Sequence, residues 1–226
     1  MFFYDWTWIV VLPALFLAMY AQSKVTSTFQ RYLREGSRLG KTGAQVAREL
    51  LDQNGLHDVP VEMVHGHLTD HYDPRSRTLR LSSAVYQSTS LAALGVAAHE
   101  TGHALQHAQN YIPLGIRNNI FPIAAFGSQM AFPLFFIGFL FRGAFLMDLG
   151  ILLFVAALLF QVITLPVEYN ASSRAIGLLT GNGYLWPDEA PKAKQVLDAA
   201  ALTYVAATAV SVMQLVRLLL LRGRRD

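Results

Sequence analysis

Apolar residues collect in four stretches of this 226-residue chain. The stretches cover residues 6–23, 118–141, 149–167 and 199–221, and each is close to the roughly 20 residues that cross a bilayer as a helix. Arg217 interrupts the fourth stretch, so a buried helix packed against the other three is the alternative there. The pattern predicts a mainly α-helical membrane protein with about four transmembrane helices. Because no basic residue precedes the first stretch, we expect a retained anchor rather than a cleaved signal peptide.

The polar segment from Lys24 to Arg117 is the only one long enough to fold in water. Its pattern predicts a helix over 42–54 capped by Thr42, and a second helix from Ser88 or Ser90 to Gln109. Residues 59–64 resemble a strand, and residues 68–72 and 77–81 resemble a hairpin around residues 73–76. Because the strand just before the second helix has an exposed pattern, we expect it at a sheet edge, where an extended peptide can pair.

We therefore divide the chain into four parts. They are a transmembrane helix over 1–23, a water-facing, zincin-like α+β domain over 24–117, a transmembrane hairpin over 118–180, and a loop with a C-terminal hydrophobic helix over 181–226. Charged residues make up 15% of the chain, against roughly a quarter in soluble domains, which agrees with a membrane protein. The chain has no cysteine, so a metal site must use His, Asp or Glu.

The basic residues lie near the ends of the apolar runs and do not form one stripe, which favours contact with a lipid bilayer over nucleic-acid binding. Five of them follow the first stretch (Lys24, Arg31, Arg34, Arg38 and Lys41). The positive-inside rule then predicts a multi-pass plasma-membrane protein with its polar domain in the cytoplasm. Four spans would leave both termini outside, which conflicts with the closing Arg222, Arg224 and Arg225. We follow the larger cluster, and the conflict disappears if the fourth stretch does not cross.

The second predicted helix contains the run His99-Glu100-Thr101-Gly102-His103. Residues four apart share a helix face, so His99 and His103 can present two imidazoles to one zinc ion (Zn²⁺). Glu100 lies one step round the helix, where it can take a proton from metal-activated water and pass it to the leaving amine. The alternative is a pair of core histidines beside a buried Glu, which is costly without a partner.

A catalytic zinc site needs a third protein ligand. A metzincin would place a Gly at position 106 and its third His at position 109, where this chain has Gln106 and Gln109. His107 lies one turn past His103 and fits a helix-surface residue better than a ligand. Glu168, at the boundary of the third span, is the best candidate, because a carboxylate there is expensive unless it is paired or bound to metal. Its alternatives are a solvated interfacial carboxylate and a partner of Arg174.

Four further residues are candidates for supporting roles. Ser172 lies one turn past Glu168 and can hydrogen-bond a metal ligand, while His71, Tyr169 and Arg174 can orient substrate or an oxyanion. For each of these a purely structural role is the alternative. The other histidines (His57, His65 and His67) look like polar residues of loops or strands.

With these residues in place, the whole chain resembles the YugP-like neutral zinc metallopeptidases of bacterial membranes. The resemblance rests on the blocks 70–74, 79–82, 98–106 and 166–172 and implies zinc and peptidase activity. More distantly the site is similar to HtpX-type membrane proteases, in which a Glu supplies the third ligand and an Asp one turn later supports the site. Glu168 matches that ligand, whereas Ser172 stands in place of the Asp and adds no charge.

We therefore expect a membrane-bound zinc endopeptidase that cleaves membrane-associated proteins or peptides with metal-activated water. The alternatives are a non-catalytic membrane protein with a structural zinc site, and a small transporter. A transporter would carry polar residues inside several spans, and these spans have few, mainly Gln129, Gln161 and Gln214.

Overall fold

The computed structural model describes residues 6–66 and 68–223, so the predictions for His67, Arg224 and Arg225, and for the five residues before the first stretch, lie outside it. The chain forms two compact units, each made of separated stretches. The apolar unit contains residues up to 22, residues 115–166 and residues from 203 onward. The polar unit contains residues 23–114 and 167–202.

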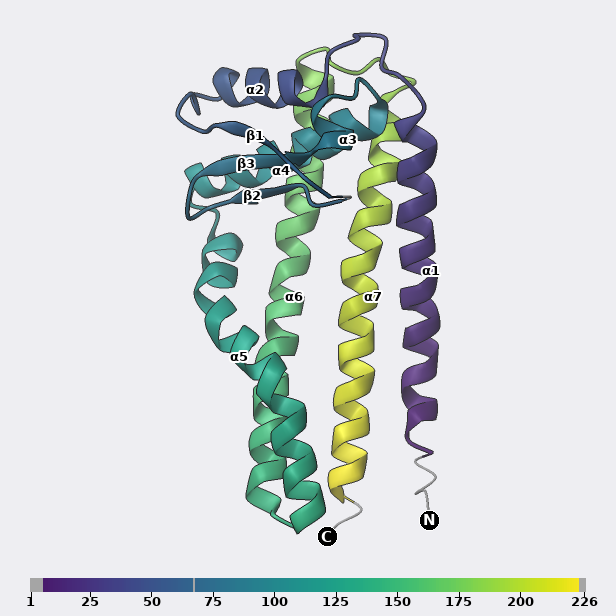
Figure 1. Cartoon of the computed structure of the whole chain (residues 1–226), viewed down its shortest axis with the longest axis vertical. Coiled ribbons are helices and arrows are strands. Elements are labelled where there is room, and N and C mark those ends of the chain that lie inside the picture. The colour runs from purple at the N-terminus through teal and green to yellow at the C-terminus, as the bar shows by residue number, and fades with distance from the viewer. Residues whose placement is uncertain (1–5, 67, 224–226) are drawn as a thin grey trace. The chain divides into compact units, whose positions relative to one another are not determined.

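Four helices of the described chain are long and apolar enough to cross a membrane, as the sequence predicts. They are α1 (Trp8–Leu33), α5 (Ile112–Phe141), α6 (Ala144–Gly181) and α7 (Ala190–Gly223) (Figure 1). The fourth stretch is therefore part of a candidate span. Three of these helices continue well into polar sequence: α1 ends at Leu33, α6 continues past Glu168 to Gly181, and α7 starts at Ala190 although its apolar part begins after Asp198. Charged side chains do not end a helix, because their stems leave the backbone hydrogen bonds intact.

The apolar unit depends on close contact between α5 and α6. A Cβ atom added to Gly127 would lie 2.6 Å from the carbonyl oxygen of Leu153, and one added to Gly150 would lie 2.6 Å from that of Ala131. Small residues allow such close packing of helices in membranes, where van der Waals contact replaces the hydrophobic driving force. Phe135, which is fully buried, belongs to the cluster that this packing forms.

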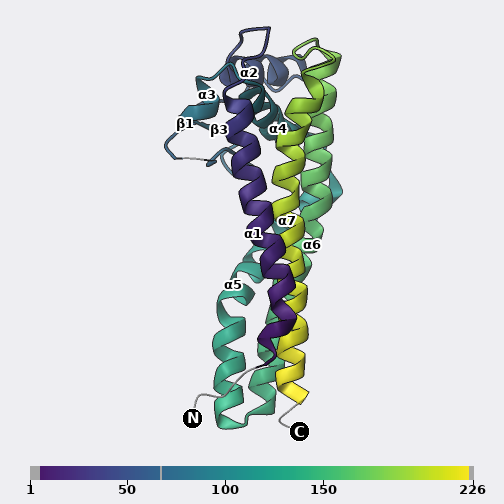
Figure 2. The ribbon, with the colours of Figure 1, turned by 90° about the vertical axis from the view of Figure 1, so that its right-hand side faces the viewer.

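Arg217 does not leave an isolated charge in α7. Its guanidinium lies 3.9 Å from the centroid of the Trp8 ring, and its Nε donates a hydrogen bond to Thr7 Oγ1 at 3.2 Å. The start of α1 therefore lies beside the end of α7, as both ribbon views show (Figures 1 and 2). A cation–π contact together with a hydrogen bond makes a buried Arg tolerable in an apolar helix.

The polar unit contains a three-stranded sheet with the order β1-β3-β2. Strand β1 (Val61–Val64) pairs parallel with β3 (Thr78–Ser82), and β2 (His71–Asp73) pairs antiparallel with β3. The predicted hairpin is confirmed, but the predicted position of its second strand is wrong. β3 is the central strand, because β1 pairs with the side of β3 that the sequence pattern predicts to be open. The edge strand of the hairpin is β2.

Three helices of the polar unit lie between α1 and α5 in the sequence: α2 (Gly43–Gln53), α3 (Ser83–Tyr86) and α4 (Leu91–Ala108). Thr42 caps α2 with a complete capping box, and the Ser90 side chain caps α4 by accepting from Ala93 N. Both caps confirm the predicted helix starts. A cluster of buried aliphatic residues, including Leu50, Leu79 and Leu94, holds α2, β3 and α4 together, and it fixes the helix that carries the histidines.

Candidate metal centre

The two histidines of α4 point to one place. His99 and His103 are one turn apart, and their rings meet edge to face with centroids 4.7 Å apart. The Nε2 atoms of the two rings face the carboxylate of Glu168 on α6, at 3.3 Å from Oε2 for His99 and 3.6 Å for His103. The structure therefore brings together the three residues that the sequence predicts as ligands, all of them within the polar unit.

The geometry of this group fits a zinc ion. Each of the three residues offers a ligand atom, and the three atoms lie within 4.8 Å of one another. Tetrahedral zinc with bonds of about 2.0–2.2 Å requires donor atoms roughly 3.3 Å apart, close to the separations from Glu168 to the two rings. The side chains of His99, His103 and Glu168 are only 14%, 12% and 5% exposed, so little water competes for them.

Electrostatics also favours a cation at this place. Burial lowers the pKa of the His103 ring, but Glu168, Glu100 and Gln106 together raise it by more, so the pKa lies above its ordinary value. The same negative charge that draws a proton to His103 attracts a metal ion. A buried carboxylate without such a partner would be costly.

Each histidine is held through its second ring nitrogen, as metal-binding histidines usually are. Ser172 Oγ lies 3.1 Å from His99 Nδ1, in the place where the sequence predicts a supporting residue. Gln106 Oε1 lies 3.0 Å from His103 Nδ1, a contact that the sequence analysis missed. The i+3 spacing from His103 to Gln106 is the signal that would have found it.

Gln106 joins α4 to α6 as well as supporting His103. Its Nε2 donates to the Val167 carbonyl at 2.9 Å and to Asn170 Oδ1 at 3.0 Å. Arg174 Nε donates to the same Asn170 oxygen at 2.7 Å, and Arg174 also donates to Gln109 Oε1 at 2.6 Å. Arg174, predicted to orient substrate, is thus placed in the polar chain behind His103.

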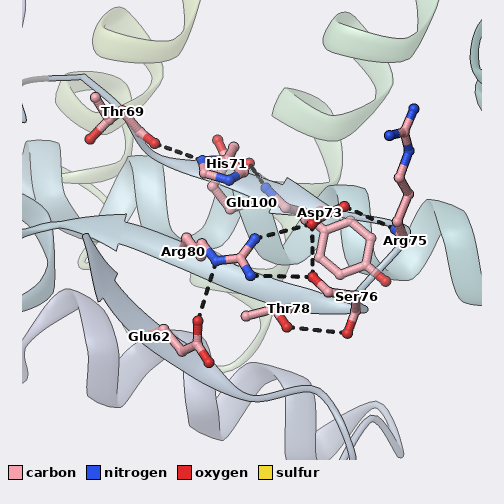
Figure 3. Close-up of polar contacts among 10 residues, drawn as sticks. Glu62, Thr69, His71, Asp73, Arg75, Ser76, Thr78, Arg80 and Glu100 are labelled. Atoms are coloured by element: carbon pink, nitrogen blue, oxygen red, sulfur yellow. Dashed lines mark hydrogen bonds and ion pairs between the residues drawn. The ribbon is translucent and has the colours of Figure 1, made fainter. Parts of the chain in front are cut away.

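Glu100 is buried beside the two ligands and points toward the sheet. Its Oε2 accepts a hydrogen bond from the backbone N–H of Tyr72 at 2.9 Å, so α4 is joined to the edge strand β2 (Figure 3). Within residues 6–66 and 68–223, Oε1 of Glu100 has no hydrogen bond, which leaves this oxygen able to accept a proton. The contact between Glu100 and Tyr72 depends on a backbone N–H, which no side-chain pattern reveals.

The strand that meets Glu100 is held in place by its own polar contacts. Asp70, whose pKa is raised by burial, accepts from Ser82 N at 2.7 Å and from Ser82 Oγ at 3.0 Å. Asp73 accepts from Ser76, Arg75 and Arg80, and these bonds, led by that from Ser76, lower its pKa to about 2 (Figure 3). The hydrogen bonds of Asp70 and Asp73 therefore fix the hairpin on both sides of Tyr72.

The remaining predicted residues lie further from the ligands. His71 is exposed on β2 and its Nδ1 lies 2.8 Å from the Thr69 carbonyl oxygen. Tyr169 follows Glu168 on α6 and is 51% exposed. His107 is half-buried and bonded to the Tyr72 hydroxyl, so the expectation of a simple helix-surface residue is corrected. His57 pairs with Asp52 at 3.1 Å on the surface.

The approach of α4 to α6 depends on Gly102. A Cβ at this position would lie 2.8 Å from the Ala171 carbonyl oxygen, so a larger residue must push the two helices apart. We expect Gly102→Ala to lower zinc affinity and to cost about 1–3 kcal/mol of stability through overpacking. Thermal unfolding and zinc titration in detergent measure both effects.

Gly177→Ala is the matched control for this prediction. Gly177 lies on α6, the helix that Gly102 approaches, and a Cβ added to Gly177 meets nothing within 4 Å. It should keep zinc affinity and match or slightly exceed the wild-type melting temperature, since Ala favours helix more than Gly. Equal behaviour of the two variants would contradict the role given to Gly102.

Comparison with known proteins agrees with this site. Residues 7–223 match the model of a family described as "Putative neutral zinc metallopeptidase". The chain is 50% identical over 220 residues to "Putative membrane protease YugP" of Bacillus subtilis. The aligned region covers 96% of this chain and 97% of that relative. No solved structure matches. The chain belongs to this metallopeptidase family, and with its four apolar helices it is a membrane protein.

Proposed function

We propose that this chain is a zinc-dependent endopeptidase that hydrolyses peptide bonds of membrane-associated proteins or peptides. The observation that carries the proposal is the convergence of the His99 and His103 Nε2 atoms on Glu168, with the buried Glu100 beside them. Among the described residues this metal-binding group has three members. Structural zinc sites are closed by four protein ligands, whereas catalytic sites keep one position open, so three ligands favour catalysis over a structural zinc.

The residues of the site have two different roles in hydrolysis, metal binding and proton transfer. His99, His103 and Glu168 would hold the zinc, which when bound polarises a substrate carbonyl and lowers the pKa of water. Glu100 takes the proton from the attacking water and delivers it to the leaving amine. Its hydrogen bond from Tyr72 N keeps the carboxylate directed at the site before substrate arrives.

We also propose that the polar domain is zincin-like. In a zincin-like domain a sheet edge lies beside the catalytic helix and receives an extended peptide. The edge that meets α4 is β2, joined to Glu100 through Tyr72. We infer that substrate pairs along β2, in place of the strand that the sequence pattern suggested. His71 and Tyr169, both exposed, remain candidates for orienting it.

Purified full-length chain in detergent tests the proposal on a panel of denatured membrane proteins. We expect cleavage that stops when a chelator removes the metal and returns when zinc is added. Cleavage that persists in chelator would overturn the assignment of the active site to this centre. A protein that binds zinc but cleaves nothing on a broad panel would support a structural zinc instead.

We also propose that the metal centre faces the cytoplasm of a multi-pass plasma-membrane protein, on the strength of the basic residues that follow the apolar part of α1. The chain has no cysteine, so single thiols can report the side of each loop. Asn182→Cys in the polar unit should react with a membrane-impermeant maleimide only after permeabilisation, and Arg142→Cys between α5 and α6 should react in intact cells. The reverse pattern would place the metal centre outside.

A further inference from the structure

A small cavity lies in the polar unit, and part of its lining comes from α4, the helix that carries the two histidines. It has a volume of about 180 Å³, below the roughly 300–1,000 Å³ of pockets for drug-sized ligands, so its size suits a single side chain. Its apolar wall consists of Leu56, Val59, Ala104 and Ala108. The rest of the lining is polar and comes from Tyr72, Arg77 and His107.

The cavity shares its walls with the catalytic machinery. Ala104 and His107 lie four and seven residues after Glu100, so they continue the helix face on which Glu100 lies. Tyr72 lines the cavity with its side chain and holds Glu100 with its backbone N–H. A peptide paired along β2 would therefore pass beside Tyr72, whose side chain lines this cavity.

The polar lining offers hydrogen-bond donors. Arg77 and Tyr72 both line the cavity, so their side chains share it. The Tyr72 hydroxyl oxygen lies 2.9 Å from His107 Nδ1. None of the described residues that line the cavity has a carboxylate.

Among the described residues of this lining, Arg77 is the one with a permanent charge. Its Nη1 pairs with Asp58 at 3.0 Å, but these side chains are 51% and 59% exposed, so the pair is weak and other N–H groups of the guanidinium stay available.

We propose that this cavity, called here the Arg77 pocket, is a specificity pocket that receives an acidic side chain of the peptide substrate. The carboxylate would accept from the Arg77 guanidinium, and the aliphatic stem would pack on the apolar wall. The inference rests on the proposed peptidase function and adds the chemical class of side chain that the site selects.

Pairs of peptides that differ only by Glu or Gln at one position test the pocket, because the two side chains have the same shape. Peptides are cleaved by full-length, zinc-loaded chain in detergent. We expect one position at which the Glu peptide has a kcat/KM at least tenfold above its Gln partner. Arg77→Gln should reduce that ratio to within twofold by slowing the Glu peptide alone. Arg75→Gln is the control, since the neighbouring Arg75 does not line the pocket and should leave the ratio unchanged.

Binding separates a failure of the pocket from a failure of the proposed function. The same peptides, labelled for fluorescence anisotropy, are titrated onto the Glu100→Gln chain with and without Arg77→Gln. A Glu preference that disappears with Arg77→Gln supports the pocket even if wild type cleaves neither peptide, which would overturn only the peptidase proposal. Equal cleavage and equal binding of Glu and Gln peptides at every position would overturn the pocket.

Discussion

Replacing Glu100 by Gln should lower kcat by about 10²–10⁴-fold, the usual contribution of a general base. Gln has the same shape and its amide oxygen can still accept from Tyr72 N, so the helix and the strand should stay in place. The amide cannot take a proton from water at neutral pH, which removes the proton transfer and little else. Bound zinc should be unchanged, because Glu100 is not among the three ligands.

Kinetics on a cleavable peptide, together with metal analysis of the same preparation, measures this effect. Glu62→Gln is the matched control, because its carboxylate lies on β1, is 52% exposed and pairs with Arg80 at 3.2 Å, away from the three ligands. It should retain wild-type kcat. A Glu100→Gln protein that keeps zinc and keeps more than a tenth of wild-type activity would contradict the role of Glu100.

Replacing Glu168 by Gln should weaken zinc binding by more than the 10–100-fold that typically follows loss of a supporting residue. The substitution keeps the size of the side chain, so the packing of α6 against α4 should survive. It removes the only negative ligand and leaves two neutral imidazoles to hold a dication. Activity should fall with zinc occupancy and return in part at high zinc.

Competition with a chromophoric chelator gives the affinities, and Ser172→Ala gives the comparison. Ser172 Oγ contacts the outer nitrogen of His99 at 3.1 Å and is not one of the three ligands, so its loss should cost no more than the range for a supporting residue. If Glu168→Gln binds zinc as tightly as Ser172→Ala does, Glu168 is not a ligand.

The parts of this molecule that follow local rules could be predicted from its sequence. Apolar runs long enough for a bilayer predicted the four spans, and Thr42 and Ser90 marked helix starts because capping needs only neighbouring residues. The histidine pair depends on helix spacing alone. Glu168 was found by a different route, since a carboxylate at a membrane boundary is costly without a partner.

Features that depend on distant contacts could not be predicted in the same way. The parallel pairing of β1 with β3 makes β3 central, and nothing in the alternation of residues 78–81 reports a neighbour from another segment. The bond from Tyr72 N to Glu100 uses the backbone, so any residue type except Pro would serve. Gln106 stands where a metzincin has Gly, so the motif assigns it no role. Its role in the structure depends on contacts with Val167 and Asn170, more than sixty residues away.

The central claim is that His99, His103 and Glu168 together bind one zinc ion, and X-ray absorption at the zinc edge tests it most directly. Purified wild-type chain should contain about one zinc with nitrogen and oxygen neighbours at about 2.0–2.2 Å, including the signature of two imidazoles. In Glu168→Ala the imidazole signature should remain while the carboxylate neighbour is lost and occupancy falls. A wild-type chain without zinc, or a first shell that is the same in wild type and Glu168→Ala, would contradict the claim.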